Sequence, residues 1–191
     1  MTFRTWLFVV LTVTMVVLDQ LSKWLVVQYI TYRQEEIVLI PGFMSLVHTR
    51  NSGAAFGMLG DFEYRMYVFA AFTLVAVVVL VHMAWQLPKD DRFQTVALAL
   101  ISSGAVGNAI DRVRQQYVTD FVLNYVEKPA ALKAWLIDTV GTNEWPAYNI
   151  ADSGIVVGLG MFVVYYLFLA RDEAVAPEPP AEPVQDIPPP R

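Results

Sequence analysis

The chain has 191 residues, of which 56% are hydrophobic, and its mean hydropathy is +0.46. This composition excludes an ordinary soluble domain and indicates a protein that spans a membrane. The formal net charge is −5 and the chain contains no cysteine. Disulfides, thiolate metal sites, a cysteine nucleophile and a lipid anchor on a cysteine of this chain are therefore excluded.

Four apolar segments are each long enough to cross a bilayer, which takes about 20 residues. They cover approximately residues 5–30, 66–87, 93–113 and 152–170. The first contains Asp19 and Lys23 and is not followed by a small-residue cleavage site, so we expect a retained span rather than a removed signal peptide. The pattern predicts an all-α membrane fold of four transmembrane helices.

The loop between the first two spans, residues 31–65, has a pattern of its own. Apolar residues 37–40 and 43–47 flank Pro41-Gly42, which predicts two short strands joined by a turn. The segment Asn51-Ser52-Gly53-Ala54-Ala55-Phe56-Gly57 follows, and its small residues permit close backbone approach. We expect a small β-rich platform at this end of the spans.

A second long loop, residues 114–148, precedes the last span. Within it, residues 129–140 place Trp135 and aliphatic neighbours at helical spacing, which predicts a short helix. Such a helix either lies in the membrane interface or is an ordinary surface helix. We also hypothesise that this loop is a mobile lid that closes over a bound peptide.

The end of the chain differs from the rest in composition. From residue 171 onward it holds five Asp or Glu residues and seven of the eleven prolines. Such a segment cannot bury a core, so we expect residues 173–191 to be a disordered tail after a membrane domain of residues 1–172.

Four spans bring the polar clusters to one face of the membrane. Both termini lie on the same side, the first and third spans are parallel, and the fourth is antiparallel to them. The ends of the first and third spans therefore share a face with the start of the fourth. The charged or amide residues that this topology gathers are Asp19, Lys23, Asn108, Asp111, Arg112, Asp120 and Asp152.

Asp120 and Asp152 carry the chemical hypothesis. A carboxylate at the bilayer centre costs about 2.5–3.5 kcal/mol on insertion scales, so carboxylates in membrane segments usually have a function. Two of them in one pocket share a proton, which suits acid/base hydrolysis of a peptide bond. Alternatively, Asp152 or Asn149 caps the fourth helix and Asp120 is an interfacial loop residue. Spacing alone favours neither interpretation.

Other polar pairs also have two interpretations. Asn108 and Arg112 are four residues apart, so both can point at one ligand, or Arg112 alone can extend to lipid headgroups. We interpret Asp19 and Lys23, also four apart, as a buried ion pair in a supporting role. The two histidines are isolated and predict no metal site.

Charge does not settle the orientation in the membrane. Eight of the thirteen Lys and Arg residues fall on the face with the polar clusters, which taken literally makes that face cytoplasmic. Arg4 and the basic residues of the very short connection 86–94 favour the reverse.

Five motifs in order resemble those of the bacterial lipoprotein signal peptidase (signal peptidase II) family, over about residues 5–170. They are Asp19-Gln20-Leu21-Ser22-Lys23, Asn51-Ser52-Gly53-Ala54-Ala55-Phe56, Gly107-Asn108-Ala109-Ile110-Asp111-Arg112, Val118-Thr119-Asp120-Phe121 and Tyr148-Asn149-Ile150-Ala151-Asp152. Two features depart from the family pattern. Tyr148 stands where phenylalanine is usual, and the stretch between the two aspartates is longer than is common.

The resemblance implies a membrane aspartic endopeptidase of the bacterial inner membrane. It would remove signal peptides from prolipoproteins on the N-terminal side of a diacylglyceryl-modified cysteine, with Asp120 and Asp152 as the catalytic dyad. The site and its support would comprise Asn51, Gly53, Asn108, Arg112, Asn149, Asp19 and Lys23. The platform, the loop and the active site would then be periplasmic, and both termini cytoplasmic.

The expected partners are the lipid-modified prolipoproteins and membrane lipids, with the protein acting as a monomer. We expect no metal, organic cofactor or nucleic acid. Two alternatives come from other classes. A small transporter or proton-channel subunit would need polar residues through the full depth of its spans, and a membrane assembly factor would need no paired carboxylates.

Overall fold

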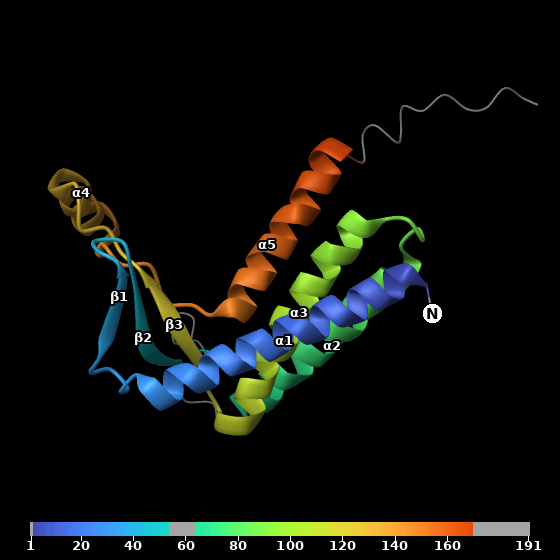
Figure 1. The fold of residues 1–191 in the computed structure, drawn as a ribbon, viewed down its shortest axis with the longest axis horizontal. Helices are drawn as coiled ribbons and strands as arrows, with labels where there is room; N and C mark the ends of the chain where they lie inside the picture. Colours follow the sequence, from blue (N-terminus) through green and yellow to red (C-terminus); the bar gives the residue numbers. More distant parts are fainter. Residues whose placement is uncertain (1, 54–63, 170–191) are drawn as a thin grey trace, which may run out of the picture.

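The computed structural model describes residues 2–53 and 64–169 (Figure 1). Its helices are α1 (Phe3–Tyr29), α2 (Arg65–Gln86), α3 (Arg92–Gln115), α4 (Ala130–Val140) and α5 (Ile150–Val164), which a π-helical segment continues through Tyr165–Leu169. Its strands are β1 (Glu36–Ile40), β2 (Met44–Asn51) and β3 (Val118–Asn124). The predicted tail, residues 173–191, lies outside the described residues.

The four predicted spans are confirmed. The helices long and apolar enough to cross a membrane are Phe3–Tyr29, Tyr67–Gln86, Arg92–Gln115 and Ile150–Leu169. Each begins and ends within a few residues of the predicted bounds. Helix α3 is central, since it packs against α1, α2 and α5. The buried polar residues of α3, among them Ser103, Asn108 and Asp111, therefore face other parts of the protein rather than lipid.

Small residues let α3 approach α1 and α5 closely. A Cβ atom on Gly107 would lie 2.6 Å from Asp19 Oδ2 of α1, and one on Gly158 would lie 2.6 Å from the Ala97 carbonyl oxygen of α3. Membrane helices associate through such small-residue contacts, because lipid offers no hydrophobic driving force between them. The close packing places Asp19 against the junction of α3 and α5.

The sheet is antiparallel in the order β1-β2-β3. Strands β2 and β3 pair from Met44 with Asn124 to Asn51 with Val118, and their register shifts between Leu46 and Thr49. The two predicted strands are confirmed, although β2 runs further and includes Asn51, which the sequence placed in a loop. The third strand was not predicted.

A small apolar core fixes the sheet to the end of α1. Its buried residues are Val26, Ile30 and Phe121, with Leu46, Val122 and Ile150 packed against them. Behind this core, the His48 ring bonds through Nδ1 to the Ile30 carbonyl oxygen at 2.9 Å. The sheet therefore holds β3 in a fixed position over the ends of the spans.

The predicted short helix of the second loop is confirmed as α4. Pro129 precedes its first turn, and Gly141, at φ +87°, ends it. The helix lies at the tip of the sheet, away from the bundle of α1, α2 and α3 (Figure 1). The loop that follows it returns to the start of α5, so α4 is connected directly to the polar face of the bundle.

Candidate active site

The start of α5 positions Asp152. Asn149 is the N-cap residue, and its Oδ1 accepts a hydrogen bond from the Asp152 backbone N–H at 3.0 Å. In return, Asp152 Oδ2 accepts one from the Asn149 backbone N–H at 3.2 Å. This reciprocal capping box satisfies two free donors of the helix end and fixes the carboxylate. The capping interpretation of Asn149 is thus confirmed, and it leaves Asp152 available as a site residue.

Asn149 also contacts the second aspartate. Its Nδ2 donates to Asp120 Oδ1 at 2.7 Å. Asp120 lies in β3, not in an interfacial loop, and its carbonyl oxygen accepts a hydrogen bond from the Thr49 hydroxyl of β2 at 3.0 Å. Asn149 therefore contacts both carboxylates that the span count predicted to lie on one face, Asp120 through its side-chain amide and Asp152 through its backbone N–H.

Asp120 is 3% exposed. Burial raises the pKa of its carboxyl to about 6, because a low-dielectric surrounding disfavours the charged form. The negative charge of Asp152 adds to this increase, whereas the Asn51 side chain, the hydrogen bond from Asn149 and the positive charge of Lys23 oppose it. A group with such a pKa can hold a proton and release it near neutral pH.

Asn108 of α3 holds the other side of Asp152. Its Nδ2 donates to Asp152 Oδ1 at 2.7 Å. Its Oδ1 accepts from Lys23 Nζ at 3.1 Å and from Asn149 Nδ2 at 3.3 Å. These two donors fix which way the amide faces, so its N–H group must point at Asp152. Both carboxylate oxygens of Asp152 thereby accept hydrogen bonds.

Lys23 is 3% exposed and lies between two carboxylates. Its Nζ is 2.8 Å from Asp19 Oδ2, which confirms the predicted ion pair, and 3.0 Å from Asp111 Oδ2. Asp19 Oδ1 also accepts the Ala151 backbone N–H at 2.9 Å. Because the first N–H groups of a helix lack partners and carry partial positive charge, this contact stabilises the start of α5.

Asp111 and Gln20 were not predicted as site residues. Asp111 Oδ2 accepts the Thr119 backbone N–H at 3.2 Å, next to Asp120 in the chain. Gln20 Nε2 donates to Asp111 Oδ1 at 3.0 Å and to the Gly107 carbonyl oxygen at 3.2 Å. The available signal was that Asp111 lies three residues after Asn108, on the same helix face.

Arg112 lies at the edge of the site. Its Nη1 donates to the Asn108 carbonyl oxygen at 3.4 Å, and its guanidinium carbon is 5.5 Å from the centre of the Phe69 ring. Its charge interacts with Asp152 and Asp120. It therefore does not extend away to lipid headgroups. Among the described residues, its buried Nε has no hydrogen-bond acceptor.

Asn51 and Gly53 form the turn that ends β2. The Gly53 N–H donates to Asn51 Oδ1 at 2.9 Å, and the Asn51 side chain lowers the pKa of the Asp120 carboxyl. Gly53 has φ +81°, and a Cβ atom there would lie 3.0 Å from the Phe69 ring. Asn51 thus closes the turn at the end of β2 and acts on the carboxyl group of Asp120.

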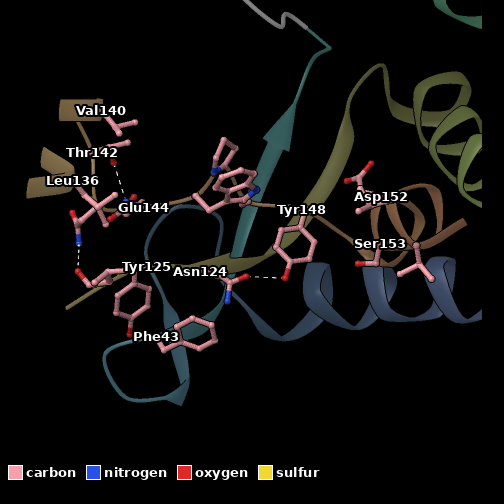
Figure 2. Close-up of a pocket in the computed structure, with 17 residues that line it drawn as sticks. Phe43, Asn124, Tyr125, Leu136, Val140, Thr142, Glu144, Tyr148, Asp152 and Ser153 are labelled. Atoms are coloured by element: carbon pink, nitrogen blue, oxygen red, sulfur yellow. Dashed lines mark hydrogen bonds between the residues drawn. The ribbon is translucent and has the colours of Figure 1, made fainter. Parts of the chain in front are cut away.

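A cavity of about 850 Å³ opens beside Asp152 (Figure 2). The start of α5, the loop before it, α4 and the tip of the sheet form its walls. Between residues 2 and 53 and residues 64 and 169, no group of three or more histidine or carboxylate side chains is arranged to hold a metal ion. The site offers two carboxylates, the amides that position them, a nearby guanidinium and a cavity.

These features together define a class: a multi-pass membrane enzyme with a carboxylate pair at one end of its helix bundle. The particular family follows from comparison with known proteins. The chain belongs to the signal peptidase (SPase) II family, whose sequence profile matches residues 11–168. This membership confirms the resemblance of the five motifs and makes the protein a membrane peptidase, rather than a transporter subunit or an assembly factor.

Individual relatives agree with this assignment. The lipoprotein signal peptidase of Geobacter metallireducens is 40% identical over 87% of this chain and 92% of its own length. That of Halalkalibacterium halodurans is 35% identical over 89% and 96%. A solved bacterial membrane enzyme, determined by the in meso method at 2.3 Å resolution, is similar with a TM-score of 0.70 and 26% identity over 90% of this chain and 92% of its own.

Proposed function

We propose that this protein is an aspartic endopeptidase that cleaves signal peptides from prolipoproteins, on the N-terminal side of a diacylglyceryl-modified cysteine. Asp120 and Asp152 are its catalytic dyad. The observation that carries this proposal is the single Asn149 side chain bonded to Asp120 and to the backbone of Asp152. The similar proteins of Geobacter metallireducens and Halalkalibacterium halodurans are lipoprotein signal peptidases, which supports a lipoprotein substrate.

The two carboxyl groups have different roles, one as the acid and one as the base. Asp120, with its pKa raised by burial, holds the shared proton and donates it to the carbonyl oxygen of the scissile bond. Asp152, whose two oxygens accept from Asn108 and Asn149, acts as the ionised partner and takes a proton from the attacking water. The tetrahedral diol then collapses: the C–N bond breaks, Asp152 gives its proton to the leaving amine, and one diol hydroxyl returns a proton to Asp120 as the new carboxyl group forms.

The surrounding amides and guanidinium position these groups. Asn108 and Asn149 orient the carboxylates, and the buried charges of Lys23, Asp19 and Asp111 hold Asn108 in turn. Arg112 lies near enough to stabilise negative charge that develops on the substrate oxygen, as preorganised donors do. No metal or organic cofactor takes part in this scheme.

The membrane determines where the scissile bond of the substrate lies. The lipid on the modified cysteine keeps the scissile bond near the bilayer surface while the signal helix remains in the bilayer. We place the protein in the bacterial inner membrane as a monomer, with the site near the periplasmic face and both termini in the cytoplasm. Helices α1, α3 and α5 meeting at Asp19, Asn108 and Asp152 support a site at one end of the bundle.

Purified protein and two forms of one prolipoprotein test this function. We expect the diacylglyceryl-modified form to be cleaved directly before its modified cysteine, as shown by the product masses, and the unmodified form to remain intact. Equal cleavage of both forms, or a cut elsewhere in the chain, would contradict the proposal.

A further inference from the structure

The cavity beside Asp152 extends well beyond the two aspartates. Figure 2 shows Asp152 and Ser153 on one side and Leu136 and Val140 of α4 on the other, with Tyr148 between them. The stretch between Asp120 and Asp152 supplies α4 and the loop after it, and so builds the far wall. The size of this cavity is therefore a property of this chain's long second loop.

The cavity wall that α5 forms lies on a membrane-spanning helix. Val156 and Val157 of α5 line the cavity and are 69% and 54% exposed, on a helix that spans the membrane. They follow Asp152 by four and five residues, which is about 6–8 Å along the helix at a rise of 1.5 Å per residue. The cavity thus connects the carboxylate level with the depth of the lipid chains.

Charge excludes one type of occupant. The carboxylates that line the cavity are Asp152 and Glu144, and its lining within the described residues contains no lysine, arginine or histidine. A phosphate headgroup would meet like charge and find no cation. Leu136, Val140 and Val157 instead offer apolar contact, so an uncharged hydrocarbon chain fits this lining.

Size excludes a second type of occupant. A membrane-spanning helix of about 20 residues is 30 Å long and at least 10 Å wide, which corresponds to roughly 2,400 Å³. The cavity measures about 850 Å³. It falls within the range of roughly 300–1,000 Å³ that is usual for small-molecule sites. The cavity is therefore too small to hold a whole signal helix.

We infer that this cavity binds one acyl chain of the lipid on the substrate's cysteine, and that Leu136 and Val140 at its α4 end limit the length of that chain. The inference rests on the proposed function and adds a specificity site to it. The scissile bond then lies at Asp152 while the hydrocarbon extends toward α4.

Synthetic lipopeptides that differ only in acyl chains of 8 or 16 carbons test this site. A larger side chain at position 136 shortens the cavity, so Leu136→Phe should lower the ratio of kcat/KM for the 16-carbon over the 8-carbon substrate by about fivefold or more, since each methylene in an apolar pocket counts strongly. Val157→Phe, on the opposite wall, should lower the same ratio. Ile137→Phe and Leu159→Phe, which lie on the same helices outside the cavity, should keep the wild-type ratio.

The outcomes distinguish a failure of the acyl-chain site from a failure of the proposed function on which it rests. Wild-type protein that cleaves neither lipopeptide contradicts the proposed function. Cleavage by the wild type with an unchanged chain-length ratio in both cavity variants overturns the acyl-chain site alone. An equal loss on both substrates means that the cavity holds a structural lipid or supports the fold, and this too overturns the inference.

Discussion

Asn149 shows how a structural role and a proposed role in the active site coincide in one side chain. Its Oδ1 caps α5 by accepting the Asp152 N–H, and its Nδ2 bonds to Asp120. The two interpretations that the sequence left open are therefore compatible. The cap that begins the helix is also the connection between the two carboxylates.

The effect of the Asn51 side chain on Asp120 predicts how the reaction rate depends on pH. It favours the ionised form of Asp120 and so lowers a pKa that burial has raised to about 6. Since the reaction needs one proton on the pair, kcat/KM should fall as the pH rises through about 6. Asn51→Ala removes this side chain, so it should raise the pKa of Asp120. The fall of kcat/KM should then occur at higher pH than in the wild type, whatever the loss in absolute rate.

The measurement is kcat/KM of the wild type and of Asn51→Ala from pH 5 to pH 8 on one lipopeptide. Thr31→Ala is the control, because Thr31 is exposed and the bond from its backbone N–H to the exposed Glu35 does not depend on its side chain. A limb that stays in place or moves to lower pH in Asn51→Ala would remove Asp120 from the role of proton donor.

The span count predicted that Asp120, Asp152 and Asn108 lie at one face, and the contacts of Asn108 and Asn149 bring them together. Their roles in catalysis came from the resemblance of the five motifs and stay a prediction. Asp111 was missed as a site residue, since a charged residue at the end of a span is equally compatible with an exposed position. Only the packing of α1 against α3 shows that Lys23 pairs with it.

At the scale of elements, the contact between α3 and its neighbours depends on glycine. Gly107→Ala would place a methyl group 2.6 Å from Asp19 Oδ2, which must move and break its contact with α5. Overpacking of this kind costs about 1–3 kcal/mol. We expect a lower midpoint of thermal unfolding in detergent together with reduced peptidase activity.

Gly160→Ala is the control for this substitution. It also lies on a spanning helix, and no described atom comes within 4 Å of a Cβ atom built there. Its unfolding midpoint should equal or slightly exceed that of the wild type, because alanine favours a helix more than glycine does. Equal midpoints for the two variants would show that the close approach at Gly107 is unimportant.

Among the elements, β3 was the one that the sequence did not predict. Its residues, Val118–Asn124, follow α3 with almost no turn signal, and its pairing with β2 joins segments far apart in the chain. The β1–β2 hairpin was predicted because Pro41-Gly42 marks a local turn. A strand whose partner is distant has no such local mark.

Helix α4 was predicted from spacing alone, and its hypothesised action as a lid remains a prediction. The structure supplies a physical basis for it, since Leu136 and Val140 line the cavity that reaches Asp152. The chain-length experiment on Leu136 measures the contribution of α4 to binding directly.

At the scale of the whole molecule, the span count explains why distant motifs meet. Four spans bring the ends of α1 and α3 to the start of α5, and the contacts of Asp19 with Ala151 and of Asn108 with Asp152 confirm this. The same count could not give the orientation in the membrane, because the basic residues are divided between the two faces.

The absence of cysteine makes the orientation testable. Asp138→Cys places a thiol on α4, and Asp90→Cys places one on the connection between α2 and α3; both positions are exposed. A maleimide that cannot cross the inner membrane should label Asp138→Cys in intact spheroplasts and Asp90→Cys only after lysis. The reverse pattern would place the site in the cytoplasm.

The most direct test of the account replaces each aspartate of the dyad by asparagine. Asparagine keeps the shape of the side chain but cannot transfer the proton, so Asp120→Asn and Asp152→Asn should each lower kcat on a diacylglyceryl-modified prolipoprotein by about 10²–10⁴-fold. Asp138→Asn on α4 is the control and should retain wild-type turnover. The variants should still insert in the membrane and elute as folded protein. A loss of less than threefold in either dyad variant would contradict the assignment of Asp120 and Asp152 as the catalytic pair.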